Sequence, residues 1–551
     1  MKLFKLYVLI CSIGYGFQEL VAQSKKPNIV FMLADDMSYD ALGFLGRYNL
    51  QTPTLDKLAK KGVRFTKSYN TTAICMASRA QLMTGLFEFA TGTNFLHGDL
   101  SYELWENSYP QKLRQQGYYV GFAGKFGFKV SEKNGKKGNT DTVRNTFDWW
   151  SGWLGQGSYA MEKNKEATAY IEKYGTKKEH TTHALGVVSE DFIGTAVQTG
   201  KPFCLSLSFK APHTPYWLDP RYMDVYKEQQ FPKPVSFGNT VVLPEQAKTG
   251  RPFMKGKTWR KDYDSAMYKY HTMVYAMDKA IEKVLAALEA NGVSDNTIVI
   301  FTSDNGHFNG AKGMGGKLYA YEEGSLAPTI IYDPRRKSSQ HYETSAALSG
   351  NIDIAPTILD FASIEDTTHR HGKSLKPIME GTVNEIHESL LLVNVWGTAS
   401  AQSLGVVTSN HKYIHWMYGA GDFQRKEELF ALNEDPYELN DLSNQKKATK
   451  VLSDLREQYD TWLALWKEEA ISNAGYTKYG RLADRYIPFD TNSQKDIETM
   501  YSEEKGKKTK KKNKLKASKK AKNNKKKIEI TYCFLKVYIK KAIVLYRNNG
   551  F

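Results

Sequence analysis

Residues 28–36 read NIVFMLADD, an apolar run that ends in two aspartates. Two later segments have the same character, PFCLSLSF at 202–209 and NTIVIFTS at 296–303. Short, nearly continuous runs of Val, Ile, Leu and Phe are typical of strands buried on both faces of a parallel sheet. Between the last two runs, residues 266–290 place apolar side chains on one helical stripe, and Gly292 ends the pattern. The alternation of strand and helix predicts an α/β domain.

Polar residues follow each of these strands. Asp35 and Asp36 follow the first strand, Asp304 and Asn305 follow the third, and the second ends in the sequence KAPH at 210–213. Ligands of open α/β sheets bind beyond the carboxyl ends of the strands, where residues far apart in sequence meet. Three carboxylates and an amide carbonyl form a hard oxygen shell that suits Ca²⁺ or Mg²⁺. Either pair alone is equally typical of a turn or a helix cap, but two such pairs at strand ends favour a metal site.

Cys75 lies in the stretch TTAICMASRAQLMTGLF at 71–87. Cys204 falls in an apolar strand and is predicted to be a core residue, so Cys75 is expected to be unpaired. Residues 78–84 have helical spacing, which places Cys75 near a helix N-terminus that favours an anion, with Arg79 one turn further on. A thiolate beside a hard dication is a chemical mismatch. Either the metal interpretation is wrong, or Cys75 is not a thiol in the working protein.

The sequence from Cys75 to Gly85, CMASRAQLMTG, closely resembles the signature C-x-P/A-S-R-x-x-L/M-T-G of the type I sulfatases, arylsulfatase-like members of the alkaline phosphatase superfamily. The resemblance covers most of the chain. Further matching segments are NIVFMLADDMSYDALG at 28–43, GYYVGFAGK at 117–125, FKAPHTP at 209–215, TIVIFTSDNG at 297–306 and ELFALNEDPYELNDL at 428–442.

This resemblance implies that Cys75 is oxidised to Cα-formylglycine, whose aldehyde hydrate supplies an oxygen nucleophile and a metal ligand. The mismatch with a hard metal then disappears. The implied metal is one Ca²⁺ ion, with Mg²⁺ less favoured. Its ligands are Asp35, Asp36, Asp304, Asn305 and Cys75 as formylglycine. The modification implies a partner during biosynthesis, a formylglycine-generating enzyme or an anaerobic maturase.

The same resemblance gives roles to four further residues. Arg79 matches the arginine that steadies the formylglycine. Lys125 and Lys317 match the two lysines that contact sulfate, and His213 matches a histidine that contacts the ester oxygen and acts as general acid. Hydrolysis of a sulfate ester needs a nucleophile, neutralisation of the non-bridging oxygens and a proton for the leaving alkoxide, and these residue types supply them.

The chain departs from the family pattern after Lys125. The family continues G-K-W-H, whereas this sequence reads G-K-F-G and has Gly127 in place of the histidine. His97, His180 and His183 are alternatives for its role, although each is better explained as a surface or structural residue. The base for sulfate release is therefore left unassigned.

The family resemblance also implies the architecture: a central mixed, largely parallel sheet flanked by helices, and a small C-terminal antiparallel sheet with a helix. The corresponding predicted ranges are a signal peptide at 1–23, a catalytic domain at 24–395, a C-terminal subdomain at 396–490 and a lysine-rich, disordered tail at 491–551. Within the subdomain, GVVTSNHKYIHW and ELFALNEDP are predicted to form strands, and residues 448–467 an amphipathic helix.

The charge distribution and the N-terminal segment limit the possible partners and location of the protein. The formal net charge is +17, but residues 505–527 hold fourteen lysines and no acid, and residues 528–551 add four basic residues and one glutamate. Residues 1–504 are therefore neutral, which argues against nucleic acid as a partner. The basic start and apolar run of residues 1–23 are typical of a secretory signal peptide, so a secreted or periplasmic location without a transmembrane anchor is expected.

The predicted substrate is a sulfated carbohydrate, a polysaccharide or its oligosaccharides. The sequence offers Trp105, Trp149, Trp150 and Trp153 either as a wall that stacks on sugar rings or as core residues. Two alternatives stay open: a phosphodiesterase or phosphonate monoester hydrolase of the same superfamily, and a non-catalytic protein that binds polyanions through its tail. The sugar, the sulfate position and the oligomeric state are not indicated by the sequence.

Overall fold

The computed structural model describes residues 26–253, 262–336, 344–472, 475–497 and 499. The predicted signal peptide and most of the predicted tail lie outside these residues. The chain divides into two compact units at Pro488, and all elements named below belong to the first. Within the described residues, no helix combines the length and apolarity that a membrane crossing requires.

An eight-stranded sheet forms the centre of the first unit, in the order β5-β4-β6-β1-β7-β8-β2-β9. The five strands from β5 to β7 are parallel, β8 is antiparallel to both neighbours, and β9 is parallel to β2. The strands are β1 (Asn28–Asp35), β2 (Val63–Phe65), β4 (Tyr119–Lys125), β5 (Trp149–Trp153), β6 (Phe203–Pro212), β7 (Thr297–Ser303), β8 (Thr329–Tyr332) and β9 (Thr344–Ser345). The predicted mixed, largely parallel sheet is confirmed.

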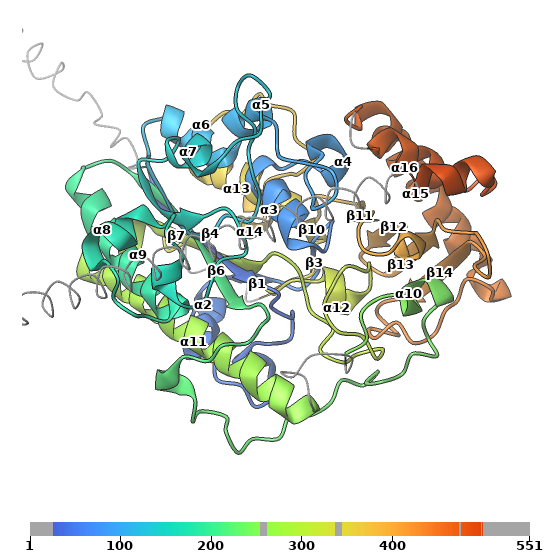
Figure 1. The fold of residues 1–551 in the computed structure, drawn as a ribbon, viewed down its shortest axis with the longest axis horizontal. Helices are drawn as coiled ribbons and strands as arrows, with labels where there is room; N and C mark the ends of the chain where they lie inside the picture. The colour runs from blue at the N-terminus through green and yellow to red at the C-terminus, as the bar shows by residue number, and fades with distance from the viewer. Residues whose placement is uncertain (1–25, 254–261, 337–343, 473–474, 498, 500–551) are drawn as a thin grey trace, which may run out of the picture. The chain divides into compact units, whose positions relative to one another are not determined.

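Helices cover both faces of this sheet (Figure 1). Alternate side chains of β1 enter two separate cores. Val30 and Met32 lie in the core on one face of the sheet, and Ile29 and Phe31 lie in the core on the opposite face. This burial on both faces explains why the strand is apolar without alternation. The covering helices are α2 (Pro53–Lys61), α9 (Thr181–Gln198) and α11 (Tyr263–Ala290) on the first face, and α3 (Cys75–Thr84), α6 (Tyr109–Gln115) and α13 (Ile354–Phe361) on the second.

The predicted helix at 266–290 is confirmed as α11, which begins three residues earlier. The Asp262 side chain accepts a hydrogen bond from Ser265 N and so caps the helix at its true start. Shorter helices are α4 (Glu88–Thr91), α5 (Tyr102–Glu106), α7 (Thr140–Arg144), α8 (Thr168–Tyr174), α10 (Glu245–Lys248), α12 (Glu322–Ser325) and α14 (Lys376–Met379). Strands β3 (Ser68–Tyr69) and β10 (Ser349–Gly350) form a small parallel pair.

A second sheet of four antiparallel strands follows in chain order: β11 (Ser389–Asn394), β12 (Ser403–Thr408), β13 (His411–Trp416) and β14 (Lys426–Ala431). The long helix α15 (Thr449–Glu469) packs against it, and α16 (Tyr476–Leu482) packs on α15. The predicted small sheet with a helix is confirmed. Because β11 belongs to this sheet, the sheet begins before residue 396, where the subdomain was expected to start.

A candidate active site at the carboxyl end of the sheet

The acidic residues after β1 and β7 meet because these strands are parallel neighbours. Asp304 N donates to the carbonyl of Ala34 at 3.1 Å, and Asp36 N donates to Asp304 Oδ1 at 3.2 Å. Asn305 Nδ2 donates to Asp36 Oδ1 at 2.7 Å. Asp36 has a left-handed backbone with φ of 68°, which is uncommon for a residue other than glycine and often occurs at functional sites. The four predicted oxygen ligands therefore form one buried cluster.

Helix α3 brings Cys75 to the same cluster. Cys75 is the first residue of the helix and is buried, and its Sγ lies within 4.8 Å of carboxylate oxygens of Asp35 and Asp304. Neither Cys75 nor Cys204 forms a disulfide, and Cys204 is a fully buried core residue as predicted. The helix N-terminus directs backbone N–H groups toward this position, which favours an anionic oxygen or sulfur there.

Arg79, one turn further along α3, is buried between carboxylates and backbone. Its Nε donates to Asp304 Oδ2 at 2.8 Å, and its Nη1 donates to the carbonyl of Lys125 at 2.5 Å. Burial alone would lower the pKa of Arg79, but Asp304 and Asp35 raise it above its usual value. Arg79 therefore joins the helix to the ends of β4 and β7 as a fixed positive charge.

Two lysines from different segments of the chain contact the cluster. Lys125, the last residue of β4, donates from Nζ to Asp35 Oδ2 at 2.5 Å and to Gln156 Oε1 at 2.9 Å. Lys317 donates to Asp36 Oδ1. Burial would raise the pKa values of Asp35 and Asp36, but the adjacent lysines, together with His213, hold both below their usual range. Both carboxylates are therefore ionised at neutral pH.

Buried oxygen atoms of the cluster lack hydrogen-bond partners among the described residues. These atoms are Asp35 Oδ1 and Asn305 Oδ1. Burial and the nearby Asp35 also raise the pKa of Asp304 to about 6, although Arg79 opposes this. A buried polar atom without a partner costs free energy, and a cation bound between these oxygens would remove that cost. The residues present therefore fit a hard divalent cation.

His213 lies at the edge of the cluster, just beyond the end of β6. Its Nε2 is 3.7 Å from Asp36 Oδ2, and its Nδ1 contacts the carbonyl of Thr214. Burial lowers the pKa of His213 to about 4, against the opposing effect of Asp36 and Asp35. The imidazole is therefore neutral at pH 7 without substrate.

The cluster opens into a pocket of about 620 Å³, which contains Cys75, Asp36, His213 and Lys317. A cavity of this size is ordinary for a small-molecule site. The pocket also contains side chains that the sequence analysis did not select: Phe95, Gln156, Tyr159, Lys210, Trp217, Arg251, His307 and Trp396.

Lys210 is the most informative of these additional residues. It is buried, and its Nζ lies 5.1 Å from the centre of the Tyr159 ring, with no ion pair described for it among the residues of the structure. Burial lowers the pKa of Lys210 to about 8, and Lys125 contributes, while Asp35 and Asp36 oppose the shift. Its place three residues before His213 in FKAPHTP is a signal that could have identified it.

Comparison with known proteins agrees with this geometry. The sequence model described as "Sulfatase" matches residues 27–364, and the model of the N-sulphoglucosamine sulphohydrolase C-terminal region matches residues 310–463. The chain belongs to the sulfatase family. As a member it is a sulfuric ester hydrolase.

Relatives include an N-acetylglucosamine-6-O-sulfatase of Bacteroides thetaiotaomicron, 27% identical over 79% of this chain and 87% of the relative. An arylsulfatase of Clostridium perfringens is 28% identical over 84% of this chain and 98% of the relative. A solved protein in complex with D-glucosamine-2-N,6-O-disulfate has a TM-score of 0.64, 24% identity and coverage of 81% and 98%. The structure of a phosphonate monoester hydrolase of Agrobacterium radiobacter also has a TM-score of 0.64, with 18% identity over 80% of this chain and 96% of that protein. These two structures show the fold alone.

The sulfatase has no space for a side chain at Gly127. Its φ is 89°, and a Cβ there would lie 2.5 Å from Arg79 Cδ. None of the alternative histidines lines the pocket. His97 packs against the rings of Tyr476 and Tyr479 in α16, and His180 Nε2 lies 2.9 Å from the carbonyl oxygen of Trp217. His183 lies in α9.

The four tryptophans considered for sugar stacking do not line the pocket of the sulfatase. Trp105, Trp150 and Trp153 are buried in the two cores, and Trp149 packs against Phe192 of α9. For these residues the core interpretation is correct. Packing between β5 and its helices explains the concentration of aromatic residues in that strand.

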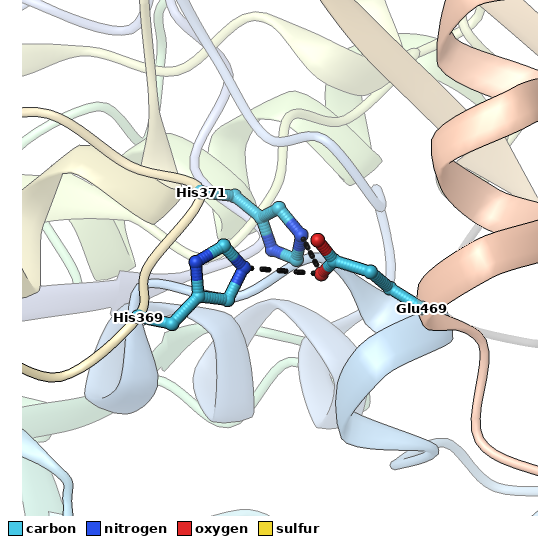
Figure 2. Close-up of side chains that lie close together, drawn as sticks. All are labelled: His369, His371 and Glu469. Carbon is cyan, nitrogen blue, oxygen red and sulfur yellow. Dashed lines mark hydrogen bonds and ion pairs between the residues drawn. The ribbon is translucent and has the colours of Figure 1, made fainter.

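A second cluster of potential metal ligands lies outside the pocket (Figure 2). His369 Nε2 and His371 Nε2 lie 3.1 Å and 2.8 Å from the same oxygen, Oε2 of Glu469 at the end of α15. His371 Nδ1 accepts a hydrogen bond from Phe87 N at 3.0 Å, so the neutral ring carries its proton on Nε2 and donates it to Glu469. A metal-bound histidine instead donates from its second nitrogen. This histidine–glutamate clamp is therefore a hydrogen-bonded structure.

The clamp lies in a loop that contacts the far end of α3. His371 N and Gly372 N each donate to the carbonyl of Gly85 at 3.0 Å, immediately after α3 ends. The last carbonyls of a helix have no partner within it, so the loop satisfies one that the C-terminus exposes. The loop thereby connects α3, which carries Cys75 and Arg79, to α15.

Proposed function

We propose that this sulfatase removes sulfate from a sulfated carbohydrate, a polysaccharide or its oligosaccharides, with Cys75 acting as formylglycine beside one Ca²⁺ ion. The observation that carries the proposal is the position of Cys75 Sγ, within 4.8 Å of carboxylate oxygens of Asp35 and Asp304. A soft thiol is a poor companion for a hard-cation site, whereas an oxygen group at the same position suits it.

The metal ligands in this proposal are Asp35, Asp36, Asp304, Asn305 and Cys75 in its modified form. The unpartnered buried oxygens of Asp35 and Asn305 support this set. The formylglycine hydrate supplies the oxygen nucleophile, and Ca²⁺ supplies positive charge beside it. Carboxylates in this number favour Ca²⁺ over Mg²⁺, which retains more of its water.

The residues around Cys75 bind and neutralise the sulfate group. Lys125 and Lys317 each contact one carboxylate of the cluster, and Lys317 also lines the pocket. In this proposal their ammonium groups neutralise the non-bridging oxygens of the bound ester. Arg79 fixes the catalytic helix to Asp304. This arrangement provides the electrostatic stabilisation that sulfuryl transfer needs.

Two groups move protons. His213 Nε2 faces the pocket and gives a proton to the leaving oxygen, and the negative charge of bound sulfate favours the protonated ring that this step requires. We assign to Lys210 the base role that the missing histidine leaves open. Lys210 is buried and lines the same pocket, and a pKa of about 8 leaves a minor fraction of its amine unprotonated near neutral pH, which is the form that accepts a proton.

The carbohydrate substrate is inferred from relatives. Proteins named as N-acetylglucosamine-6-sulfatases from goat and human are 30% and 29% identical over 68% and 71% of this chain. An ulvan-active sulfatase of Formosa agariphila is 26% identical over 82%. The proposal includes a maturase that oxidises Cys75 to formylglycine. It also includes a secreted or periplasmic location, on the basis of the sequence of residues 1–23.

The first experiment is mass spectrometry of the tryptic peptide 68–79, from protein made together with a maturase. Formylglycine would make this peptide about 18 Da lighter than encoded. Sulfate released from a panel of sulfated oligosaccharides is measured in parallel by ion chromatography. An unmodified thiol in fully active protein would contradict the proposal.

Two comparisons separate the alternatives. Turnover of aryl sulfate is measured against aryl phosphate and phosphonate esters, because the fold is shared with phosphonate monoester hydrolases. Deletion of residues 505–551 tests a polyanion-binding role for the lysine-rich tail. The proposal predicts a preference for sulfate and activity that survives the deletion.

A further inference from the structure

The mouth of the catalytic pocket carries aromatic side chains that remain exposed. Trp217 is 61% exposed and Phe95 is 43% exposed, and both line the pocket. Trp396, which is half-buried, lies against Phe95 with ring centres 5.7 Å apart. Large apolar side chains that gather at a concave site, rather than singly over the surface, indicate a binding function.

These three rings come from three different segments of the chain. Phe95 follows α4, Trp217 follows β6, and Trp396 follows β11 of the C-terminal sheet. The carbonyl of Trp217 contacts His180 Nε2 at 2.9 Å, and His180 Nδ1 accepts from Thr182 N. The neutral ring therefore donates from Nε2 and anchors the Trp217 backbone, although it does not enter the pocket.

Cys75 lines the buried part of this pocket, and Phe95 and Trp217 line its exposed part, so a ligand that has its sulfate near Cys75 and fills the pocket contacts these rings. The pocket volume of about 620 Å³ lies within the range of sites that bind drug-sized ligands, which are larger than one pyranose ring. The part of the ligand at the mouth is therefore a group attached to the sulfated residue.

The side chains at the mouth define the chemistry of that group. Flat aromatic faces match the C–H faces of a pyranose ring, and their burial by such a ring is favourable. Arg251 also lines the pocket and is exposed, and its carbonyl accepts from Gly315 N, close to Lys317. A guanidinium group at this place suits a sulfate or carboxylate.

We propose that Phe95, Trp217 and Trp396 form a binding site for a second, anionic sugar ring, whose charged group contacts Arg251. This inference rests on the proposed carbohydrate sulfatase function. It makes the enzyme selective for a sulfated residue within an oligosaccharide over the same residue as a free monosaccharide.

The test compares kcat/KM for glucosamine 6-sulfate with kcat/KM for heparin-derived di- and tetrasaccharides that end in the same residue. The wild type is expected to prefer the oligosaccharides at least tenfold. Trp217→Ala and Phe95→Ala should lower kcat/KM for the oligosaccharides about tenfold and for the monosaccharide less than twofold. Arg251→Gln should lower it for oligosaccharides with a charged second ring, and not for those with a neutral one.

Met223→Ala is the matched control, since Met223 is 44% exposed and lies outside the pocket. The inference is overturned if the wild type turns over monosaccharide and oligosaccharide with equal kcat/KM, or if the three variants affect both substrates alike. Hydrolysis of aryl sulfate without turnover of any sugar sulfate would refute the carbohydrate function and this inference together. Equal turnover of both sugar substrates would refute the inference and leave the proposed function intact.

Discussion

Two clusters in this sulfatase gather side chains that can bind a metal ion, and they differ in how those side chains are satisfied. In the acidic cluster at the carboxyl end of the sheet, Asp35 Oδ1 and Asn305 Oδ1 are buried without a partner among the described residues. In the histidine–glutamate clamp, His371 Nε2 contacts Glu469 (Figure 2). Its Nδ1 accepts from the backbone N–H of Phe87, which fixes the proton on Nε2. Proximity of ligand-type residues is common to both clusters.

Buried atoms without partners, rather than residue types, therefore separate the proposed metal site from the clamp. A buried oxygen without a hydrogen bond costs free energy that a cation can recover. A histidine whose Nδ1 already accepts from the backbone would have to give up that bond, or lose its last proton, before Nε2 could bind a metal. The two clusters should therefore respond oppositely to mutation and to metal.

Asp35→Asn is expected to have the largest effect. It removes a proposed metal ligand and leaves the buried Lys125 ammonium without its carboxylate. We expect kcat/KM for an aryl sulfate to fall by about a thousandfold or more, since electrostatic stabilisation of this kind contributes several kcal/mol. His369→Ala in the clamp is the control and should stay near wild type. Loss of activity with His369→Ala, or its retention with Asp35→Asn, would break the comparison.

Removal of calcium is expected to have the next largest effect. A chelator should abolish most of the activity and lower Tm, and Ca²⁺ at a hundred times its Kd should stabilise the protein by about 2.7 kcal/mol. Calorimetry with wild type and with His369→Ala plus His371→Ala should give the same calcium stoichiometry. A lower metal content in the double variant would place an ion in the clamp and contradict our distinction.

Much of the fold and of the acidic cluster was predictable, because apolar strands and the acidic residues that follow them can be read from short stretches of sequence. The strands β1, β6 and β7 are apolar throughout since both faces are buried, and their parallel order brings Asp35 and Asp304 to one edge. The antiparallel placement of β8 was not predictable, because strand partners depend on contacts between distant segments. The assignment of β11 to the second sheet has the same cause.

The pocket mouth and the clamp could not be found from sequence for a related reason. Phe95 and Trp396 lie in contact although they are 301 positions apart, and Glu469 is 98 positions from His371. A tryptophan is equally apolar in a core and at a pocket. The sequence therefore offered the tryptophans of β5 as candidates for a sugar-binding wall and gave no signal for Trp217. Lys210 differs from these, since it lies within a recognised motif and was missed despite a local signal.

His371→Ala sharpens the comparison through stability instead of activity. The variant leaves Phe87 N without its acceptor and removes ring contacts with Phe87 and Phe89. We expect the free energy of unfolding to fall by about 1–3 kcal/mol, measured by urea denaturation. His369→Ala, whose side chain is 65% exposed, should change it by less than about 0.5 kcal/mol. Equal losses in both variants would show that the two histidines act as one unit.

The smallest expected effect is a dependence of stability on pH that originates in the clamp. Burial and the neighbouring His369 lower the pKa of His371, although Glu469 opposes them. The folded protein therefore binds this proton more weakly than the unfolded chain, and the contribution of His371 to stability is present above about pH 6.5 and decreases as the pH falls below it. His371→Gln should remove this contribution, because a glutamine does not titrate. Urea denaturation between pH 5 and 8 should show the wild type losing its advantage over His371→Gln toward low pH, and a growing advantage there would show that the clamp is held by a protonated His371.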